Sequence, residues 1–256
     1  MDGAFDISIL PLLSFLILLT LPVLTFRYLK LKLTKSLIIA TSRMIIQLAL
    51  VAVYLEYIFK LNSTLVNFTW ILVMIFAANT TILRQSGLPL KRFLAYTFFP
   101  SAITVFFIFL SFLLIFKHQT LFSARYMVPL AGMLLGNILT SSVVGLERFY
   151  SELRKRENEY IQYVSLGASL QEAVKPFLRE AYRASMAPQI AGLATMGLVA
   201  LPGMMTGQIL GGSSPVVAIK YQIMIMIAIF VAASSSVVLT ISLSKKAAFD
   251  ELGRLK

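Results

Sequence analysis

The sequence predicts an all-α integral membrane protein with about seven transmembrane helices, its N-terminus outside and its C-terminus in the cytoplasm. Of its 256 residues, 58% are apolar and only 13% are charged, whereas a soluble domain carries roughly a quarter charged residues. The apolar residues also gather in long runs, and a helix needs about 20 of them in sequence to cross a bilayer. The chain therefore has too little polar surface for a water-soluble domain.

Seven runs are long and apolar enough to cross, and they follow one another along the chain. We expect spans at 7–26, 37–59, 65–83, 93–116, 126–146, 190–210 and 216–243. The first run follows Asp2 and Asp6 and precedes Arg27, which reverses the charge order of a cleavable signal peptide. It is therefore expected to stay in the mature protein, and residues 1–256 are expected to form one transmembrane domain.

The basic residues between the spans predict the orientation. Of the 23 Lys and Arg residues, 18 lie in four segments: four in 27–36, three in 84–92, seven in 147–189 and four in 244–256. Basic residues are enriched in cytoplasmic loops, so these four segments are expected to face the cytoplasm. With seven spans, this arrangement places the N-terminus outside.

Charge and composition exclude several classes of function. A net charge of +12 is also typical of nucleic-acid-binding proteins, but here the basic residues lie in short segments between apolar runs, so the lipid membrane and not nucleic acid is the expected partner. The chain has no cysteine and one histidine, His118, which excludes disulfides, thiolate sites and histidine-based metal sites. It has no G-x-x-x-x-G-K-[ST] motif, so any ATP that drives it is bound elsewhere.

The predicted cytoplasmic loop 147–189 has helical periodicity. Phe149, Leu153, Tyr160 and Val164 recur at intervals of four, seven and four residues, which lays one apolar stripe along a charged helix. This helix is expected to end at Leu166-Gly167-Ala168, because glycine readily adopts the left-handed conformation of a C-terminal cap.

A second helical element is expected to begin at Ser169, since Ser169 and Glu172 fit a capping box. Pro176 is expected to interrupt or kink this element, which continues to Pro188. The loop is either simple connecting structure or a docking elbow for a cytoplasmic partner protein. The candidate docking residues are Glu159, Tyr160, Leu166, Gly167, Ala168, Ser169, Glu172, Ala173 and Pro176.

Several strings resemble the FetB-type permeases of the iron-export ABC transporters. The most specific is Leu201-Pro202-Gly203-Met204-Met205-Thr206-Gly207-Gln208; the others include Leu166-Gly167-Ala168-Ser169, Met127-Val128-Pro129, Glu147-Arg148-Phe149 and Lys220-Tyr221-Gln222-Ile223. The resemblance covers nearly the whole chain. It implies a multi-pass permease of the bacterial inner (plasma) membrane that works as a homodimer, exports iron or a related solute, and pairs with a cytoplasmic ABC ATPase that binds ATP–Mg. Plant members of the family are tied to aluminium tolerance, so the substrate stays open.

Polar groups inside spans are the other pointers to function, because charge at the bilayer centre is costly. The candidate residues of a substrate path or gate are Gln47, Glu56, Pro202, Gly203, Met204, Met205, Thr206 and Gln208. Glu56 either pairs with Lys60 one helical turn later or faces the interior as the only acidic metal ligand. Pro202 and Gly203 are expected to kink the sixth span and free the carbonyls near residues 198 and 199.

Three classes of function are compatible with a polytopic helical chain. The first is an ABC permease subunit, and the second is a stand-alone secondary transporter or channel. The third is a membrane-embedded enzyme, which needs a constellation of His, Asp, Glu or Cys at membrane depth that this chain does not supply. We therefore expect no catalytic residues in this chain.

Overall fold

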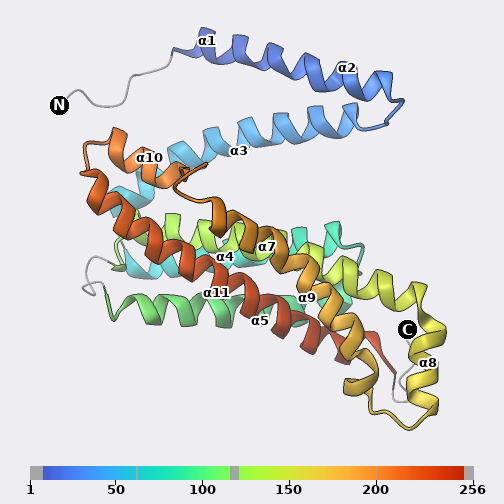
Figure 1. The fold of residues 1–256 in the computed structure, drawn as a ribbon. Coiled ribbons are helices and arrows are strands. Elements are labelled where there is room, and N and C mark those ends of the chain that lie inside the picture. The colour runs from blue at the N-terminus through green and yellow to red at the C-terminus, as the bar shows by residue number, and fades with distance from the viewer. Residues whose placement is uncertain (1–7, 62, 116–120, 200, 251–256) are drawn as a thin grey trace.

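The computed structural model describes residues 8–61, 63–115, 121–199 and 201–250, and every regular element within these ranges is a helix (Figure 1). His118 lies outside the described residues. The elements are α1 (Ile9–Ser14), the 3₁₀ helix η1 (Phe15–Leu19), α2 (Thr20–Tyr28), α3 (Thr34–Leu61), α4 (Thr64–Gln85), α5 (Leu90–Phe112), α7 (Ala124–Lys155), α8 (Glu157–Ser165), α9 (Leu170–Thr195), α10 (Gly203–Leu210) and α11 (Pro215–Ala248). The predicted all-helical class is confirmed.

Six helical stretches in the described ranges are long and apolar enough to cross a membrane. They are Leu10–Tyr28, Thr34–Leu61, Thr64–Gln85, Leu90–Phe112, Ala124–Lys155 and Pro215–Ala248. Each overlaps one of the expected spans. The first of them tightens to 3₁₀ geometry at η1, just before Pro22, which lacks the N–H that would bond the carbonyl four residues earlier.

The packed core of the bundle is built around α7. Helices α4, α5, α9 and α11 surround it (Figure 1). The core includes Leu134, Ile138 and Phe149 of α7. A tyrosine and a glycine of α7 illustrate how α11 fits against it. Tyr150 donates a 2.7 Å hydrogen bond to Ser244 of α11, and Gly145 lies against Val237 of α11. Small residues at such contacts let helix backbones approach closely, which is how helices associate in lipid.

The N-terminal helices make far less contact with this core. Ile58 is the only residue of α3 that is fully buried, and it lies in a small cluster with Ala124 and Val128 of α7. The ring of Tyr54 packs against that of Trp70 in α4, with 3.9 Å between centroids. Most apolar side chains of α2 and α3 are therefore open to lipid or to another protein.

The described parts of the basic segments gather at one end of the bundle (Figure 1). The end of α11 meets the start of α5, where the Arg92 side chain donates a hydrogen bond to the carbonyl of Ala247. The end of α11 also meets α8, where the rings of Tyr160 and Phe249 lie 5.6 Å apart. The connections α2–α3 and α4–α5 lie toward this same end, and α10 lies at the opposite one (Figure 1). The clustering of Lys and Arg along the sequence therefore makes one end of the bundle more basic than the other.

Two expectations about α9 differ from the structure. Pro176 does not interrupt the element that begins at Ser169, since α9 runs unbroken from Leu170 to Thr195 and contains Pro176 and Pro188; the alternative, a kink at Pro176, stays a prediction. Buried contacts of Ala173, Val174 and Phe177 hold the helix across the hydrogen bond that Pro176 cannot make. The expected continuous span at 190–210 is instead divided between the end of α9 and the short α10.

The α7–α11 contact yields a test of the packing. A Cβ added at Gly145 would lie 2.9 Å from Cγ1 of Val237, whereas one added at Gly136 of the same helix meets no atom within 4 Å. We expect Gly145→Ala to cost about 1–3 kcal/mol of unfolding free energy through overpacking. Gly136→Ala should be neutral or stabilising because alanine favours a helix by about 1 kcal/mol.

The measurement is thermal unfolding of both variants in the same detergent, followed by circular dichroism. Equal midpoints for Gly145→Ala and Gly136→Ala would contradict the close approach of α7 and α11.

Candidate functional site

The predicted docking elbow is a helix–turn–helix built by two local capping motifs. At the end of α8, Gly167 has φ +90°; its N–H bonds the carbonyl of Val164, and the N–H of Ala168 bonds that of Tyr163, both at 3.0 Å. This pair of bonds is a Schellman motif. At the start of α9, the Ser169 side chain accepts from the N–H of Glu172, and the Glu172 carboxylate accepts from the N–H of Ser169 at 2.9 Å. Both predicted caps are confirmed.

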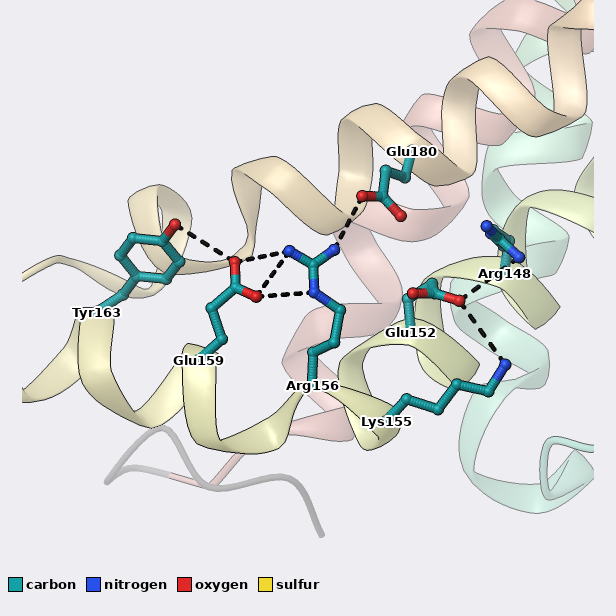
Figure 2. A network of polar contacts seen from close by, with 7 residues as sticks. All are labelled: Arg148, Glu152, Lys155, Arg156, Glu159, Tyr163 and Glu180. Carbon is teal, nitrogen blue, oxygen red and sulfur yellow. Dashed lines mark hydrogen bonds and ion pairs between the residues drawn. The ribbon is translucent and has the colours of Figure 1, made fainter.

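The helix that leads into the elbow is divided at Arg156, which the sequence pattern did not predict. Arg156 leaves helical geometry at φ −114° and ψ 37°, so α7 and α8 meet at an angle. Its guanidinium donates to the Glu159 carboxylate at 2.7 Å and to Glu180 of α9 at 2.9 Å and lies 5.2 Å from the ring centre of Phe177. Figure 2 shows this cation holding α8 against α9.

A second, separate ion-pair group lies on α7 beside this bridge. The Glu152 carboxylate lies 3.5 Å from Arg148 and 3.8 Å from Lys155, and both partners are on the same helix (Figure 2). Pairs three or four residues apart on one helix add only about 0.2–0.5 kcal/mol each. The Arg156 bridge differs because it joins residues far apart in sequence, so it sets where the elbow lies.

The elbow divides the predicted docking residues into an exposed tip and a buried base. Leu166 is 86% exposed and Ile161 is 50% exposed, although both are apolar and lie on a charged element. Tyr160 and Ala173 are instead buried in the core, and Glu159 is held by Arg156. The remaining candidates are exposed or half-buried around the tip: Gly167, Ala168, Ser169, Glu172 and Pro176.

A basic hollow opens beside the tip. It has a volume of about 770 Å³ and lies between the start of α9 and the end of α11. Lys175, Lys245 and Lys246 line it, and the only acidic residue in its lining is Glu172, which the cap already engages. An exposed leucine next to an excess of positive charge is a surface suited to a protein that presents an apolar socket and carboxylates.

The predicted gate segment is a helix break, not a kink. Helix α9 ends at Thr195, and Gly197 follows with φ +87°. Pro202 is the N-terminal cap of α10, and Gly203 is its first residue. Proline is compatible with a helix start but not with a helix interior, so Pro202 begins a new helix instead of bending the old one. The release of the carbonyls near residues 198 and 199 stays a prediction.

The other predicted path residues lie on two separate elements. Met204, Met205 and Gln208 of α10 are half-buried, and the hydroxyl of Thr206 donates to the carbonyl of Pro202 at 3.2 Å. Gln47 lies exposed on α3. Glu56, also on α3, pairs with Lys60 at 2.8 Å on an exposed surface, which agrees with the surface-pair alternative. In the described ranges no group of three His, Cys, Asp or Glu side chains is close enough to hold a metal ion.

A cavity of about 430 Å³ lies where α9 breaks. Its lining includes Met196, Pro202, Met205, Gln222, Ile223 and Met226. Gln222 of α11 was not among the predicted path residues. Only its position, as a polar amide within an apolar span, could have indicated it from the sequence. Arg156 was missed as well, since its partner Glu180 is 24 residues away.

Comparisons with known proteins place this chain among membrane proteins. The family model described as "Uncharacterised protein family (UPF0014)" matches residues 9–249. The UPF0014 membrane protein YjkA of Bacillus subtilis is 31% identical over 87% of this chain and 88% of its own length. The probable iron export permease protein FetB of Escherichia coli is 34% identical over 88% of this chain and 86% of its length.

A plant protein also matches. The protein ALUMINUM SENSITIVE 3 of Arabidopsis thaliana is 30% identical over 77% of this chain and 71% of its own length. No solved structure matches the chain significantly. The family, its bacterial members and the six apolar helices place the chain in the inner membrane as a multi-pass protein.

The capping box gives the elbow a pH dependence. Hydrogen bonds from the Ser169 side chain and then from its backbone N–H hold the pKa of Glu172 below its ordinary value. The cap therefore stabilises α9 above the ordinary glutamate pKa, and this stabilisation is lost as pH falls through the lowered pKa. In Ser169→Ala the pKa of Glu172 should rise toward its ordinary value, so the cap should open at a higher pH.

Hydrogen exchange of the amides at 169–173, followed by mass spectrometry and corrected for the intrinsic effect of pH, measures this opening. Loss of protection at the same pH in Ser169→Ala and the unaltered chain would show that the Ser169 hydroxyl does not hold Glu172.

Proposed function

Because this chain belongs to the UPF0014 family of membrane proteins, we propose that it is the membrane-spanning permease subunit of an ABC transporter that exports iron or a related solute. A separate cytoplasmic ATPase subunit supplies the energy and binds ATP–Mg, since this chain has no phosphate-binding loop. The name of the FetB relative, a probable iron export permease, supports the direction and the substrate.

The exposed tip of the elbow is the observation that carries this proposal. Leu166 protrudes from a turn that two capping motifs and the Arg156 bridge hold in place. A connecting loop needs neither an exposed leucine nor such a rigid frame. An ATPase can bind a rigid apolar tip and transmit its conformational change to the permease, whereas a flexible tip would move without displacing the helices.

The proposed topology makes the basic end of the bundle cytoplasmic, with the N-terminus outside and the C-terminus inside. The six long helices then account for six crossings. The C-terminal part of α9 together with α10 forms the seventh. The broken helix is tolerated at membrane depth only where protein or water satisfies its free backbone groups. We propose that the break is the moving part of the transport path.

Helix α9 connects the tip to the break as one element. Its buried residues Phe177, Ala181 and Ser185 face the core, and Gln189 donates to Ser141 of α7 at 3.2 Å. When ATP closes two ATPase subunits, a pull on Leu166 displaces α9 along α7 and moves the end of α9 relative to α10. Two copies of the permease match two ATPase subunits, and the sparsely covered helices α2 and α3 offer the surface for pairing.

The rival function is a stand-alone secondary transporter, which the broken α9–α10 pair also suits, because such transporters bind ions at discontinuous helices. They usually carry buried carboxylates for ion coupling. Glu56 of α3 is not such a buried carboxylate, because it lies on the surface and pairs with Lys60. Dependence on an ATPase partner separates the two functions.

We expect Leu166→Asp to reduce capture of the ATPase by at least about tenfold, because an interface centre that is apolar does not accept an unpaired carboxylate. Asn158→Asp is the matched control, since Asn158 is an exposed residue near the start of α8, away from the tip. The measurement is copurification from the native host, with the partner identified by mass spectrometry as a P-loop ATPase and quantified per permease.

A P-loop ATPase recovered equally with Leu166→Asp and Asn158→Asp would remove the tip from the interface. Failure to recover any such ATPase with the unaltered chain would favour the secondary transporter.

A further inference from the structure

Three lysines line the basic hollow beside the elbow. Lys175 reaches it from α9, and Lys245 and Lys246 reach it from the end of α11. Among the residues that the structure describes, no carboxylate lies within ion-pair distance of these three ammonium groups. Other lysines do find carboxylates, as Lys60 does with Glu56 at 2.8 Å. Because ammonium groups gathered in one hollow repel one another, the hollow favours an anion.

The rest of the lining indicates what kind of anion fits. Glu172 is the only acidic residue there, and its carboxylate already accepts from the N–H and the hydroxyl of Ser169 at 2.9 and 2.7 Å. Leu170 and Leu178 also line the hollow, so ammonium groups and apolar side chains meet in one place. A ligand that is anionic at one end and apolar at the other matches this lining.

The position of the hollow along α11 places it at the surface of the bilayer. Residues 221–244 contain no charged side chain, and at about 1.5 Å per residue this stretch is about 36 Å long. The hydrocarbon core of a bilayer is about 30 Å thick, and the headgroups extend it to about 40–45 Å. Lys220 and Lys245, which flank the stretch, therefore lie at the headgroup levels of the two leaflets. The hollow opens at the depth of lipid phosphates.

We propose that this hollow binds the phosphate headgroup of an anionic phospholipid, whose glycerol and upper acyl chains lie against Leu170 and Leu178. Lysine is a common phosphate ligand, and basic pockets between spanning helices at the cytoplasmic side bind anionic headgroups. Leu166 is not part of the lining, so the hollow is separate from the tip that is proposed to bind the ATPase. The lipid site goes beyond the transport proposal and shares with it only the orientation of the bundle.

A phosphate in the hollow bridges α9 and α11. Lys175 belongs to the helix that carries the elbow, whereas Lys245 and Lys246 belong to the helix that packs along α7. Without an anion, like charges face one another between these two helices. A bound phosphate replaces this repulsion with attraction to a shared negative charge. The lipid therefore holds the start of α9 against the end of α11, and lipid composition controls how freely the elbow moves.

Native mass spectrometry of the full chain in a non-ionic detergent tests the proposal by counting the lipids bound per chain. Phosphatidylglycerol is the anionic probe, and phosphatidylcholine is the zwitterionic control. Inorganic phosphate, added in excess to the phosphatidylglycerol complex, tests whether a free phosphate is the ligand instead.

The variants remove charge inside and outside the hollow. A double Gln variant, Lys245→Gln with Lys246→Gln, removes the two lysines of α11, and Lys175→Gln removes the one of α9. Lys91→Gln with Lys155→Gln is the matched control, because both residues are exposed at the same end of the bundle, at the start of α5 and the end of α7, and neither lines the hollow. Lys245→Arg with Lys246→Arg keeps the charge of the hollow.

We expect saturable binding of a single phosphatidylglycerol per chain, and weaker binding of phosphatidylcholine because its choline cation faces the lysines. A lysine near an anionic headgroup contributes about fivefold in affinity. Lys175→Gln should therefore weaken phosphatidylglycerol binding about fivefold, and the double Gln variant about 25-fold. The Arg variant and the control at Lys91 and Lys155 should bind as the unaltered chain does, and inorganic phosphate should not displace the lipid.

Three results would overturn the proposal. Undiminished binding to the double Gln variant, or an equal loss in the control at Lys91 and Lys155, would show that the hollow itself does not hold the lipid. Displacement by inorganic phosphate would make it a site for a soluble anion. Loss of ATPase copurification in the double Gln variant, with lipid binding intact, would assign the hollow to the ATPase. The lipid measurement contains no ATPase, so its failure leaves the transport proposal in place.

Discussion

Hydrocarbon excludes charge, and this constraint governs both the sequence and the fold of the chain. Of the 23 Lys and Arg residues, 18 lie in four segments, and the helices bring the described parts of those segments to one end of the bundle, where Arg92 meets α11 and Tyr160 meets Phe249. The elbow lies at that end because α7 leaves the core there as a charged helix. At the other end, the uncharged break between α9 and α10 borders a mostly apolar cavity. The two ends therefore have different chemistry, and a single helix, α9, joins them.

Much of this arrangement was predictable, because the information is local. Apolar runs of sufficient length predict spanning helices, and the caps at Gly167 and Ser169 are read from residues within a few positions of one another. The family resemblance carried by the strings around Pro202 also held, since the family model covers 9–249. Local rules failed where tertiary contacts compete with them. Pro176 breaks isolated helices, yet α9 continues through it because Ala173, Val174 and Phe177 are packed in the core.

The candidate sites show the same division. The exposure of Leu166 followed from its place in a turn, and the apolar stripe predicted the buried face of Tyr160. The contact of Tyr160 with Phe249 and the burial of Ala173 were not predicted, because they depend on the assembled helices. The helix break between α9 and α10 was anticipated only as a kink, because the sequence shows where proline removes a hydrogen bond but not where the preceding helix stops. Arg156 and Gln222 act across the fold: one joins α8 to Glu180, and the other completes a cavity made by α9, α10 and α11. Contacts between residues this far apart in the sequence can be identified only once the helices are placed relative to one another.

The end that carries the elbow is proposed to face the cytoplasm, where ATP is available to a partner. The chain has no cysteine, so single cysteines report their side of the membrane without background. Ser165→Cys places one at the end of α8, and Ser213→Cys places one between α10 and α11, both at exposed positions. In intact spheroplasts a membrane-impermeant maleimide should label Ser213→Cys at once and Ser165→Cys only after the membrane is opened. Labelling of Ser165→Cys in sealed spheroplasts, with Ser213→Cys protected, would contradict this orientation.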